Sequence, residues 1–180
     1  MDKGVHNVLL KSRVICLNER VNDGEASRIS EALILLNAEG DAPITLYINS
    51  NGGNTDAGFS IYDMLQHSVA PVTGIVQQKA YSAASVVLQG CHTRKALKHA
   101  QLLIHNGSIT MDKEFDALGP DLEREVLEVI NKCIKKRTIM YDIYAQRTGK
   151  SVEEIEEICL AGKELSADEA KDIGLIDEVI

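Results

Sequence analysis

Short apolar runs alternate along the chain with segments whose apolar residues recur at helical spacing. Segments rich in β-branched and aliphatic side chains predict four strands, at 12–17, 43–48, 71–76 and 101–105. A weaker strand is predicted at 95–97. Apolar spacing of three and four residues predicts helices between them: 25–38, 55–66 and 82–89. Gly90 is expected just past the last of these helices. Strands separated by helices predict parallel crossovers and an α/β fold.

The C-terminal half is predicted to be mainly helical. A long helix is expected from Pro120 to about Arg147, because Pro120 suits a first helical position and Gly149 follows the run. Its apolar stripe comprises Leu122, Val126, Val129, Ile130, Cys133, Met140 and Tyr144. Such a helix exceeds the usual length, so we expect it to project and to bury its stripe against another copy of the chain. Two shorter helices are predicted after it, one opened by a Ser151–Glu154 capping box and one at 167–173.

Composition narrows the class of protein. The chain has 180 residues, 44% of them hydrophobic, which fits one globular domain spanning 1–180. The formal net charge is −8, so no nucleic-acid partner is expected. No run of 18 apolar residues and no apolar N-terminal signal occurs, so we expect a cytoplasmic protein without a membrane partner.

The cysteines do not indicate a metal or redox site. Four are present, widely separated and without a C-x-x-C pair: Cys16, Cys91, Cys133 and Cys159. Three of them lie in apolar patterns and are interpreted as small core residues. We therefore expect no metal and no disulfide.

Three local features carry candidate chemistry. Gly52 and Gly53 lie between a strand and a helix, where backbone N–H groups can approach an anion. Ser82 is placed near a helix N-terminus, beside free N–H groups suited to an oxyanion. His105 ends an apolar strand and can serve as a general base. Each also has an ordinary explanation: a turn, an N-cap serine and an idle loop histidine.

Taken in order, the segments of this chain resemble the Clp protease proteolytic subunit family (ClpP), from about residue 9 to 180. The pattern Tyr-Ile-Asn-Ser-Asn-Gly-Gly is similar to the family's glycine motif, Ala-Tyr-Ser to its nucleophile segment and Leu-Ile-His to its histidine segment. The C-terminal Leu-Ser-Ala-Asp-Glu-Ala and Gly-Leu-Ile-Asp resemble its final signature. These segments occupy 47–53, 80–82, 103–105, 165–170 and 174–177.

The resemblance implies both a fold and an activity. The fold would be a ClpP/crotonase-type α/β fold of repeated β-β-α units with a projecting handle at about 106–149. The activity would be that of a serine endopeptidase with nucleophile Ser82 and general base His105, and with an oxyanion hole formed by the N–H groups of Gly53 and Ala83. It also implies a homo-oligomeric tetradecamer of two stacked heptameric rings, peptide or unfolded-protein substrates, an AAA+ unfoldase partner and no cofactor.

The chain departs from the family pattern at several points. The family's triad aspartate corresponds to Gly162, and Glu164 is the nearest carboxylate that alternation could place on the same side. The handle is longer than usual, and few residues precede Leu10, so the axial loop is expected to be short or absent. Ser-Ala-Ala-Ser, which starts at Ser82, resembles divergent and phage-encoded relatives.

Three functions remain open at the level of sequence. The first is an active peptidase that works with a Ser82–His105 pair. The second is a catalytically weak or inactive structural ring subunit, which loss of the aspartate favours. The third is a crotonase-type acyl-CoA enzyme, which would also use paired N–H groups but would not require Ser82 and His105 in register.

Overall fold

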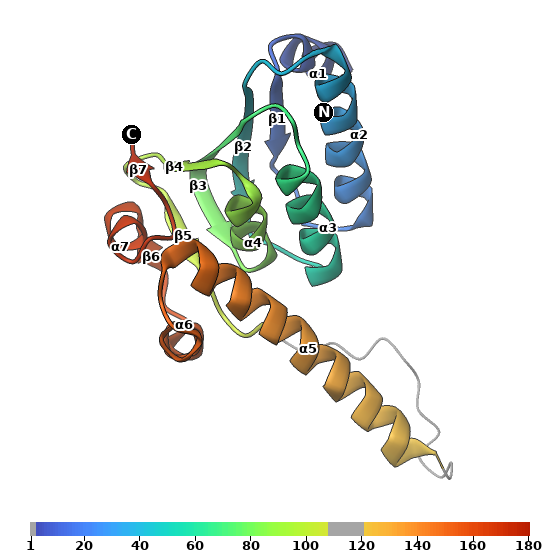
Figure 1. Ribbon diagram of the computed structural model, residues 1–180, viewed down its shortest axis with the longest axis vertical. Coiled ribbons are helices and arrows are strands. Elements are labelled where there is room, and N and C mark those ends of the chain that lie inside the picture. The colour runs from blue at the N-terminus through green and yellow to red at the C-terminus, as the bar shows by residue number, and fades with distance from the viewer. Residues whose placement is uncertain (1–2, 108–120) are drawn as a thin grey trace.

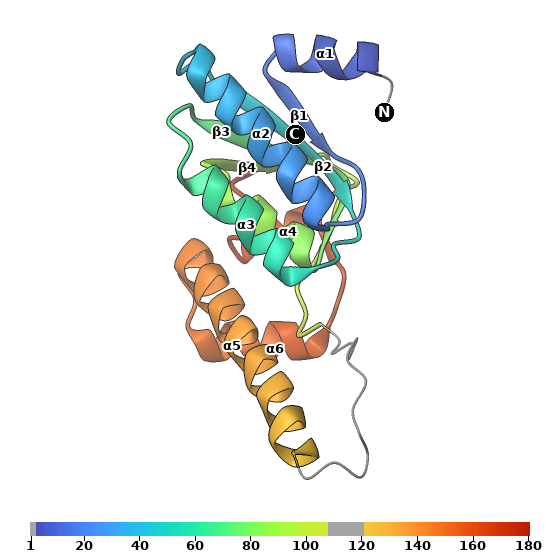
Figure 2. The same cartoon turned by 90° about the vertical axis from the view of Figure 1, so that its right-hand side faces the viewer.

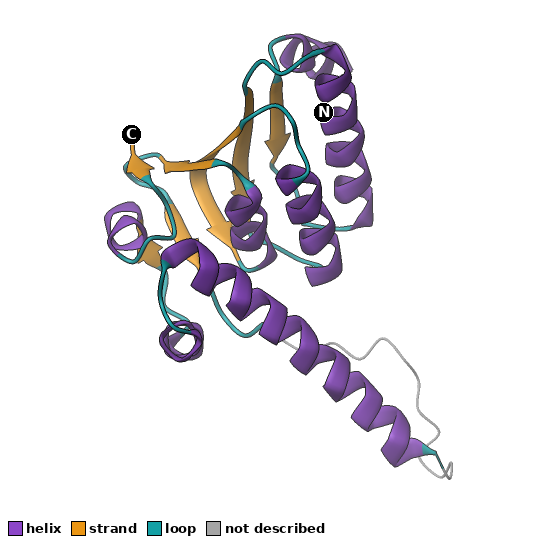
Figure 3. Cartoon of the chain, in the orientation of Figure 1, coloured by secondary structure: helices purple, strands orange, loops and turns teal. Residues whose placement is uncertain are grey.

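The computed structural model describes residues 3–107 and 121–180. Its centre is a seven-stranded sheet in the order β1-β2-β3-β4-β7, with β5 beside β3 and β6 beside β5. All pairs are parallel except β5–β6, and helices lie around the sheet (Figures 1 and 3). The α/β class predicted from the sequence is therefore confirmed.

The strands and helices follow one another in a largely alternating order. The strands are β1 (Val14–Leu17), β2 (Ile44–Ser50), β3 (Val72–Tyr81), β4 (Thr93–Ala96), β5 (Gln101–Leu103), β6 (Leu165–Ser166) and β7 (Glu178–Val179). The helices are α1 (Lys3–Lys11), α2 (Asp23–Glu39), α3 (Thr55–Gln66), α4 (Ala83–Gly90), α5 (Leu122–Thr148), α6 (Val152–Ala161) and α7 (Ala167–Asp172).

Strand β3 has two partners on the same side, one after the other. Its first half pairs with β4, and its last residues, Lys79–Tyr81, pair with β5. The end of β5 is thereby set beside the end of β3, where α4 begins. Two sequence-distant segments that carry candidate chemistry consequently meet at one sheet edge.

Helices α2, α3 and α4 lie next to one another over one face of the sheet (Figure 2). Their apolar positions pack against alternate residues of β2 and β3 in a continuous core that includes Leu33, Leu46, Ile61 and Val87. Burial of this kind contributes roughly 25 cal/mol for each Å² of apolar surface removed from water. The core therefore fixes the ends of β2 and β3 and the start of α4.

Helix α5 projects from this body (Figure 1). Its buried residues are confined to its last third and are Met140, Tyr141, Ile143 and Tyr144. Earlier in the helix, Leu127, Ile134 and Ile139 are exposed. The predicted projecting helix is confirmed, while the predicted start at Pro120 lies outside the described residues.

Some predicted element boundaries were wrong, and the helix α1, which precedes β1, was not predicted. Strand β3 continues to Tyr81 instead of ending at Val76, because its last residues exchange partners from β4 to β5. Gly90 is the last helical residue, with Cys91 as the cap. A Cβ on Gly90 would lie 3.0 Å from backbone atoms of Tyr62, so close packing against α3 accounts for glycine at this position.

Candidate active site

Ser82 stands at the junction of β3 and α4 in an unusual conformation. Its backbone has φ 54 and ψ −126, and its side chain makes no capping hydrogen bond with α4. Its N–H donates to the carbonyl of Leu103 in β5 at 2.9 Å. A non-glycine residue at positive φ is strained and has to be held by its surroundings. The N-cap explanation for this serine is therefore not supported by the geometry.

Gly52 packs directly against Ser82. At φ +82, a Cβ on Gly52 would lie 2.4 Å from the carbonyl oxygen of Tyr81, 2.8 Å from Ser82 Cβ and 2.9 Å from the nitrogen of Ala83. Only glycine fits this contact, because no other residue lacks a Cβ. The paired glycines thus bring the turn after β2 against the start of α4.

Two N–H groups have no partner inside their own elements. Ala83 is the first residue of α4, where a helix provides no acceptor. The bridge of Val21 with Gly53 uses the carbonyl of Gly52 and the N–H of Asn54, which leaves the Gly53 N–H outside the pairing. Gly52 links the two groups, because it precedes Gly53 and contacts the Ala83 nitrogen. This arrangement suits the binding of a negatively charged oxygen.

His105 lies two residues after the end of β5, the strand whose Leu103 carbonyl accepts a hydrogen bond from the Ser82 N–H. Burial lowers the pKa of its half-buried imidazole, which favours the neutral, basic form. Its Nδ1 accepts a hydrogen bond of 3.1 Å from the N–H of Gly107. A neutral ring that accepts at Nδ1 carries its proton on Nε2. Within residues 3–107 and 121–180, no hydrogen bond or ion pair joins His105 to Ser82 or to a carboxylate.

Among the described residues, no hydrogen bond or ion pair joins Gly162 or Glu164 to His105. Gly162 caps the C-terminus of α6 at φ 56, and its N–H donates to the carbonyl of Ile158. A glycine is favoured at such a helix end because it tolerates the left-handed region. Glu164 is exposed and lies near Tyr81, whose pKa is raised by burial and, in addition, by this carboxylate. Tyr81 is the last residue of β3 and pairs with Leu103, the last residue of β5, so Glu164 lies near the ends of these two strands.

Helix α5 contacts both halves of the site through residues that the sequence had not singled out as functional. The Tyr144 hydroxyl hydrogen bonds to Ser85, one turn after the nucleophile candidate. The Tyr141 hydroxyl donates to Asn106, directly after His105. The three-residue spacing of these tyrosines puts both hydroxyls on one helix face, the signal that could have identified them.

The remaining titratable groups offer no alternative site. Burial raises the pKa of the Cys91 and Cys159 thiols to about 12, so both are unreactive. Within the described ranges, no cluster of three histidine, cysteine or carboxylate side chains could hold a metal ion. No helix among them is long and apolar enough to cross a lipid bilayer.

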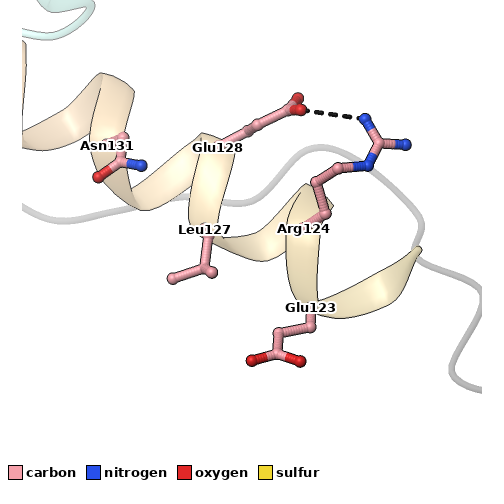
Figure 4. Close-up of a pocket in the computed structure, with 5 residues that line it drawn as sticks. All are labelled: Glu123, Arg124, Leu127, Glu128 and Asn131. Carbon is pink, nitrogen blue, oxygen red and sulfur yellow. Dashed lines mark hydrogen bonds and ion pairs between the residues drawn. The ribbon is translucent and has the colours of Figure 1, made fainter. Parts of the chain in front are cut away.

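The first part of α5 carries a shallow surface groove. Glu123, Arg124, Leu127, Glu128 and Asn131 line it, and Arg124 pairs with Glu128 at 3.2 Å (Figure 4). The groove contains neither a serine nor a histidine. Its open shape and mixed lining suit a contact surface better than a catalytic centre.

Candidates for a serine-peptidase site on this α/β fold are the glycines that follow β2, the strained serine that follows β3 and the histidine that follows β5. Comparison with known proteins agrees, since the family model "Clp protease" matches residues 2–180. The chain belongs to the Clp protease family.

Two solved structures show the same architecture. ClpP1 from Listeria monocytogenes is 26% identical and superposes with a TM-score of 0.81. A variant of that protein carrying an Asn-to-Asp substitution gives a TM-score of 0.84 at the same identity. Each match covers 98% of this chain and 95% of the other. The ClpP-type fold implied by the sequence motifs is thus confirmed.

Proposed function

We propose that this chain is a serine endopeptidase subunit in which Ser82 attacks the scissile carbonyl and His105 accepts its proton. The observation that carries the proposal is the strained backbone of Ser82, fixed between Gly52 and β5 at the start of α4. An N-terminal serine of a helix needs no such strain for capping. No cofactor takes part in the proposed reaction, and residues 1–180 act as one peptidase domain.

The backbone supplies the electrostatic part of the mechanism. As Ser82 Oγ attacks, the carbonyl oxygen becomes an oxyanion, and the N–H groups of Gly53 and Ala83 donate to it. The positive end of α4 adds to this stabilisation. Loss of one such donor in a comparable site reduces turnover about 100-fold to 1,000-fold.

The histidine has to change its tautomer before it can act. Transfer of the Ser82 proton to Nε2 requires a ring protonated at Nδ1, but Nδ1 accepts from Gly107 in the structure. The Gly107 bond must therefore break first. A carboxylate that accepts from Nδ1–H would favour this rearrangement. Since no carboxylate among the described residues hydrogen bonds to His105, we expect a slow enzyme.

Covalent labelling tests the assignment of the nucleophile. A fluorophosphonate probe should label the wild-type chain and the Ser85→Ala variant, and Ser82→Ala should abolish the label. Intact-mass analysis and peptide mapping would locate the adduct. Label that persists in Ser82→Ala and disappears in Ser85→Ala would show that the register is wrong.

Restoring the carboxylate tests the support of the histidine. Counting on from the pair Leu102–Leu165 in the antiparallel β5–β6 register sets position 162 opposite His105. A Cβ on Gly162 meets nothing within 4 Å, and aspartate tolerates left-handed angles better than most residues. Gly162→Asp should raise peptide hydrolysis at least about tenfold, equivalent to about 1.4 kcal/mol of barrier. Gly162→Asn is the matched control, because it has the same shape without the charge.

Glu164→Gln separates the remaining possibilities. If Glu164 is the third member of the triad, this substitution removes most activity and Gly162→Asp adds none. If a Ser82–His105 pair acts alone, Glu164→Gln leaves the rate unchanged.

The alternative function is a catalytically weak or inactive ring subunit. The hydrogen bond from Gly107 to His105 favours it, since the ring as it stands cannot accept a proton at Nε2. A wild-type chain that assembles but does not react with the probe, together with a Gly162→Asp variant that does, would support this alternative.

Stacked rings joined through α5 are the assembly we propose. The support is the apolar surface of the projecting helix, where Leu127, Ile134 and Ile139 are exposed. Two heptameric rings would enclose a chamber for peptides or unfolded chains, and an AAA+ unfoldase would supply them. The exposed part of the handle, about 106–149, would then be covered by another copy.

A further inference from the structure

A chain of two buried hydroxyl groups leads from α5 to the backbone of Ser82. Ser85 Oγ lies 2.6 Å from the carbonyl oxygen of Ser82 and 2.5 Å from the hydroxyl of Tyr144. Ser85 and Tyr144 are both completely buried. Burial raises the pKa of Tyr144, so its hydroxyl stays protonated.

The order of the protons follows from the acceptor at the end of the chain. A carbonyl oxygen can only accept, so the Ser85 hydroxyl donates to Ser82. The Ser85 proton is then committed, and the Tyr144 hydroxyl must donate to Ser85 Oγ. Each hydrogen bond polarises the next, which strengthens the bond on the Ser82 carbonyl.

The Ser82 carbonyl and the Ala83 N–H belong to the same planar peptide group. Whatever fixes the direction of the carbonyl therefore also fixes the direction of the N–H, which points the opposite way in the same plane. The carbonyl also accepts from the backbone N–H of Ser85 at 2.9 Å and of Val86 at 3.4 Å, but the Ser85 hydroxyl is the closest donor.

We propose that Ser85 and Tyr144 are positioning residues that aim the Ala83 N–H at the oxyanion by holding the Ser82–Ala83 peptide plane. This inference rests on the proposed function. It assigns to α5 a role inside the subunit: its last third orients the oxyanion hole through Tyr144.

Three variants test the proposal, with the second-order rate constant of fluorophosphonate labelling and kcat and KM for a peptide as readouts. Ser85→Ala should lower the labelling rate and kcat about tenfold with little change in KM, because orientation of one oxyanion donor is lost. Tyr144→Phe should produce a smaller loss of several-fold, since Ser85 keeps its bond to Ser82. The double variant should react as slowly as Ser85→Ala, because Tyr144 acts through Ser85.

Thermal stability separates positioning from a structural role. Ser85→Ala leaves the buried Tyr144 hydroxyl without its partner, so its Tm should fall most. The double variant removes that unpaired hydroxyl and should regain part of the lost Tm while its rate stays low. Thr148→Val is the matched control, because it deletes another hydroxyl-to-backbone bond of α5, to the Tyr144 carbonyl at 2.7 Å, without touching Ser82.

The outcomes distinguish this inference from the proposed function. If Ser82→Ala abolishes labelling but all three variants react within twofold of wild type, the positioning role is wrong and the peptidase assignment stands. Rates that recover together with Tm in the double variant would also overturn the positioning role. If Ser82→Ala still labels at the wild-type rate, the proposed function itself is wrong.

Discussion

Gly52→Ala is the substitution that most directly tests the contact between the glycine turn and Ser82. The added methyl group would lie 2.4 Å from the Tyr81 carbonyl oxygen, well inside van der Waals contact, and 2.9 Å from the Ala83 nitrogen. Those neighbours are backbone atoms, which cannot rotate away as a flexible side chain would. The start of α4 or the glycine turn must shift.

The loss of folding stability expected for Gly52→Ala has two parts. Holding alanine at φ +82 costs about 1–2 kcal/mol. Overpacking against backbone adds about 1–3 kcal/mol. The free energy of unfolding should therefore fall by about 2–5 kcal/mol. Labelling of Ser82 should slow at least about 100-fold, since both proposed oxyanion donors are displaced.

Gly149→Ala is the matched control. Gly149 has φ +74 at the C-terminus of α5, and a Cβ there meets nothing within 4 Å. This variant has only the backbone cost of about 1–2 kcal/mol and should label at the wild-type rate.

Urea denaturation and probe labelling at one protein concentration measure both effects, because assembly makes apparent stability depend on concentration. Equal losses of stability in the two variants, or normal labelling in Gly52→Ala, would refute the close contact of Gly52 with Ser82.

Three further predictions follow. Light scattering should show an assembly of twelve or more chains, which charges introduced by Val126→Lys and Ile130→Lys should dissociate. Glu153→Lys on α6 should leave the assembly intact, and a monomeric wild type at micromolar concentration would contradict the handle assignment. Because burial lowers the pKa of His105, the rise of kcat/KM with pH should have its midpoint below pH 6.5, and a midpoint above pH 6.5 would count against His105 as the base. Asp177→Asn should lower the free energy of unfolding by about 2 kcal/mol, since Asp177 pairs with the buried Arg94. Burial opposes ionisation of Asp177, but the hydrogen bonds and charge of Arg94 prevail and lower its pKa. The stability difference between wild type and variant should therefore persist above pH 3.8 and vanish as pH falls through the lowered pKa, which urea denaturation at a series of acidic pH values can check.

The fold was largely predictable because each core element has a strong local signal. The helix at Thr55–Gln66 has an asparagine cap and apolar spacing, and both its ends are as predicted. The long helix ends at Thr148, before a left-handed Gly149, as its sequence indicates. Strand β3 was predicted too short because Gln77 and Gln78 interrupt its apolar pattern. What continues the strand is its exchange of partner from β4 to β5, a tertiary effect with no local signature.

The site was predictable only in part, for a similar reason. A serine after a strand and a histidine at a strand end can be read from the sequence. The strained angles of Ser82 cannot, because they arise from the close approach of Gly52 and from the Leu103 carbonyl. Nor can the Ser85–Tyr144 bond, since it joins residues 59 positions apart that meet only after α5 packs on α4.

The backbone and side-chain parts of the proposed site differ in how firmly they are held. Ser82 is bonded through its N–H to β5 and through its carbonyl to α4 and, by Ser85 and Tyr144, to α5. His105 has only the local bond from Gly107, and that bond selects the tautomer that cannot accept a proton at Nε2. The proposed oxyanion hole is therefore preorganised, whereas the proposed general base is not. Variants that support the imidazole should consequently raise the rate, while further rigidity around Ser82 should not, because the barrier that remains lies in orienting and deprotonating through His105.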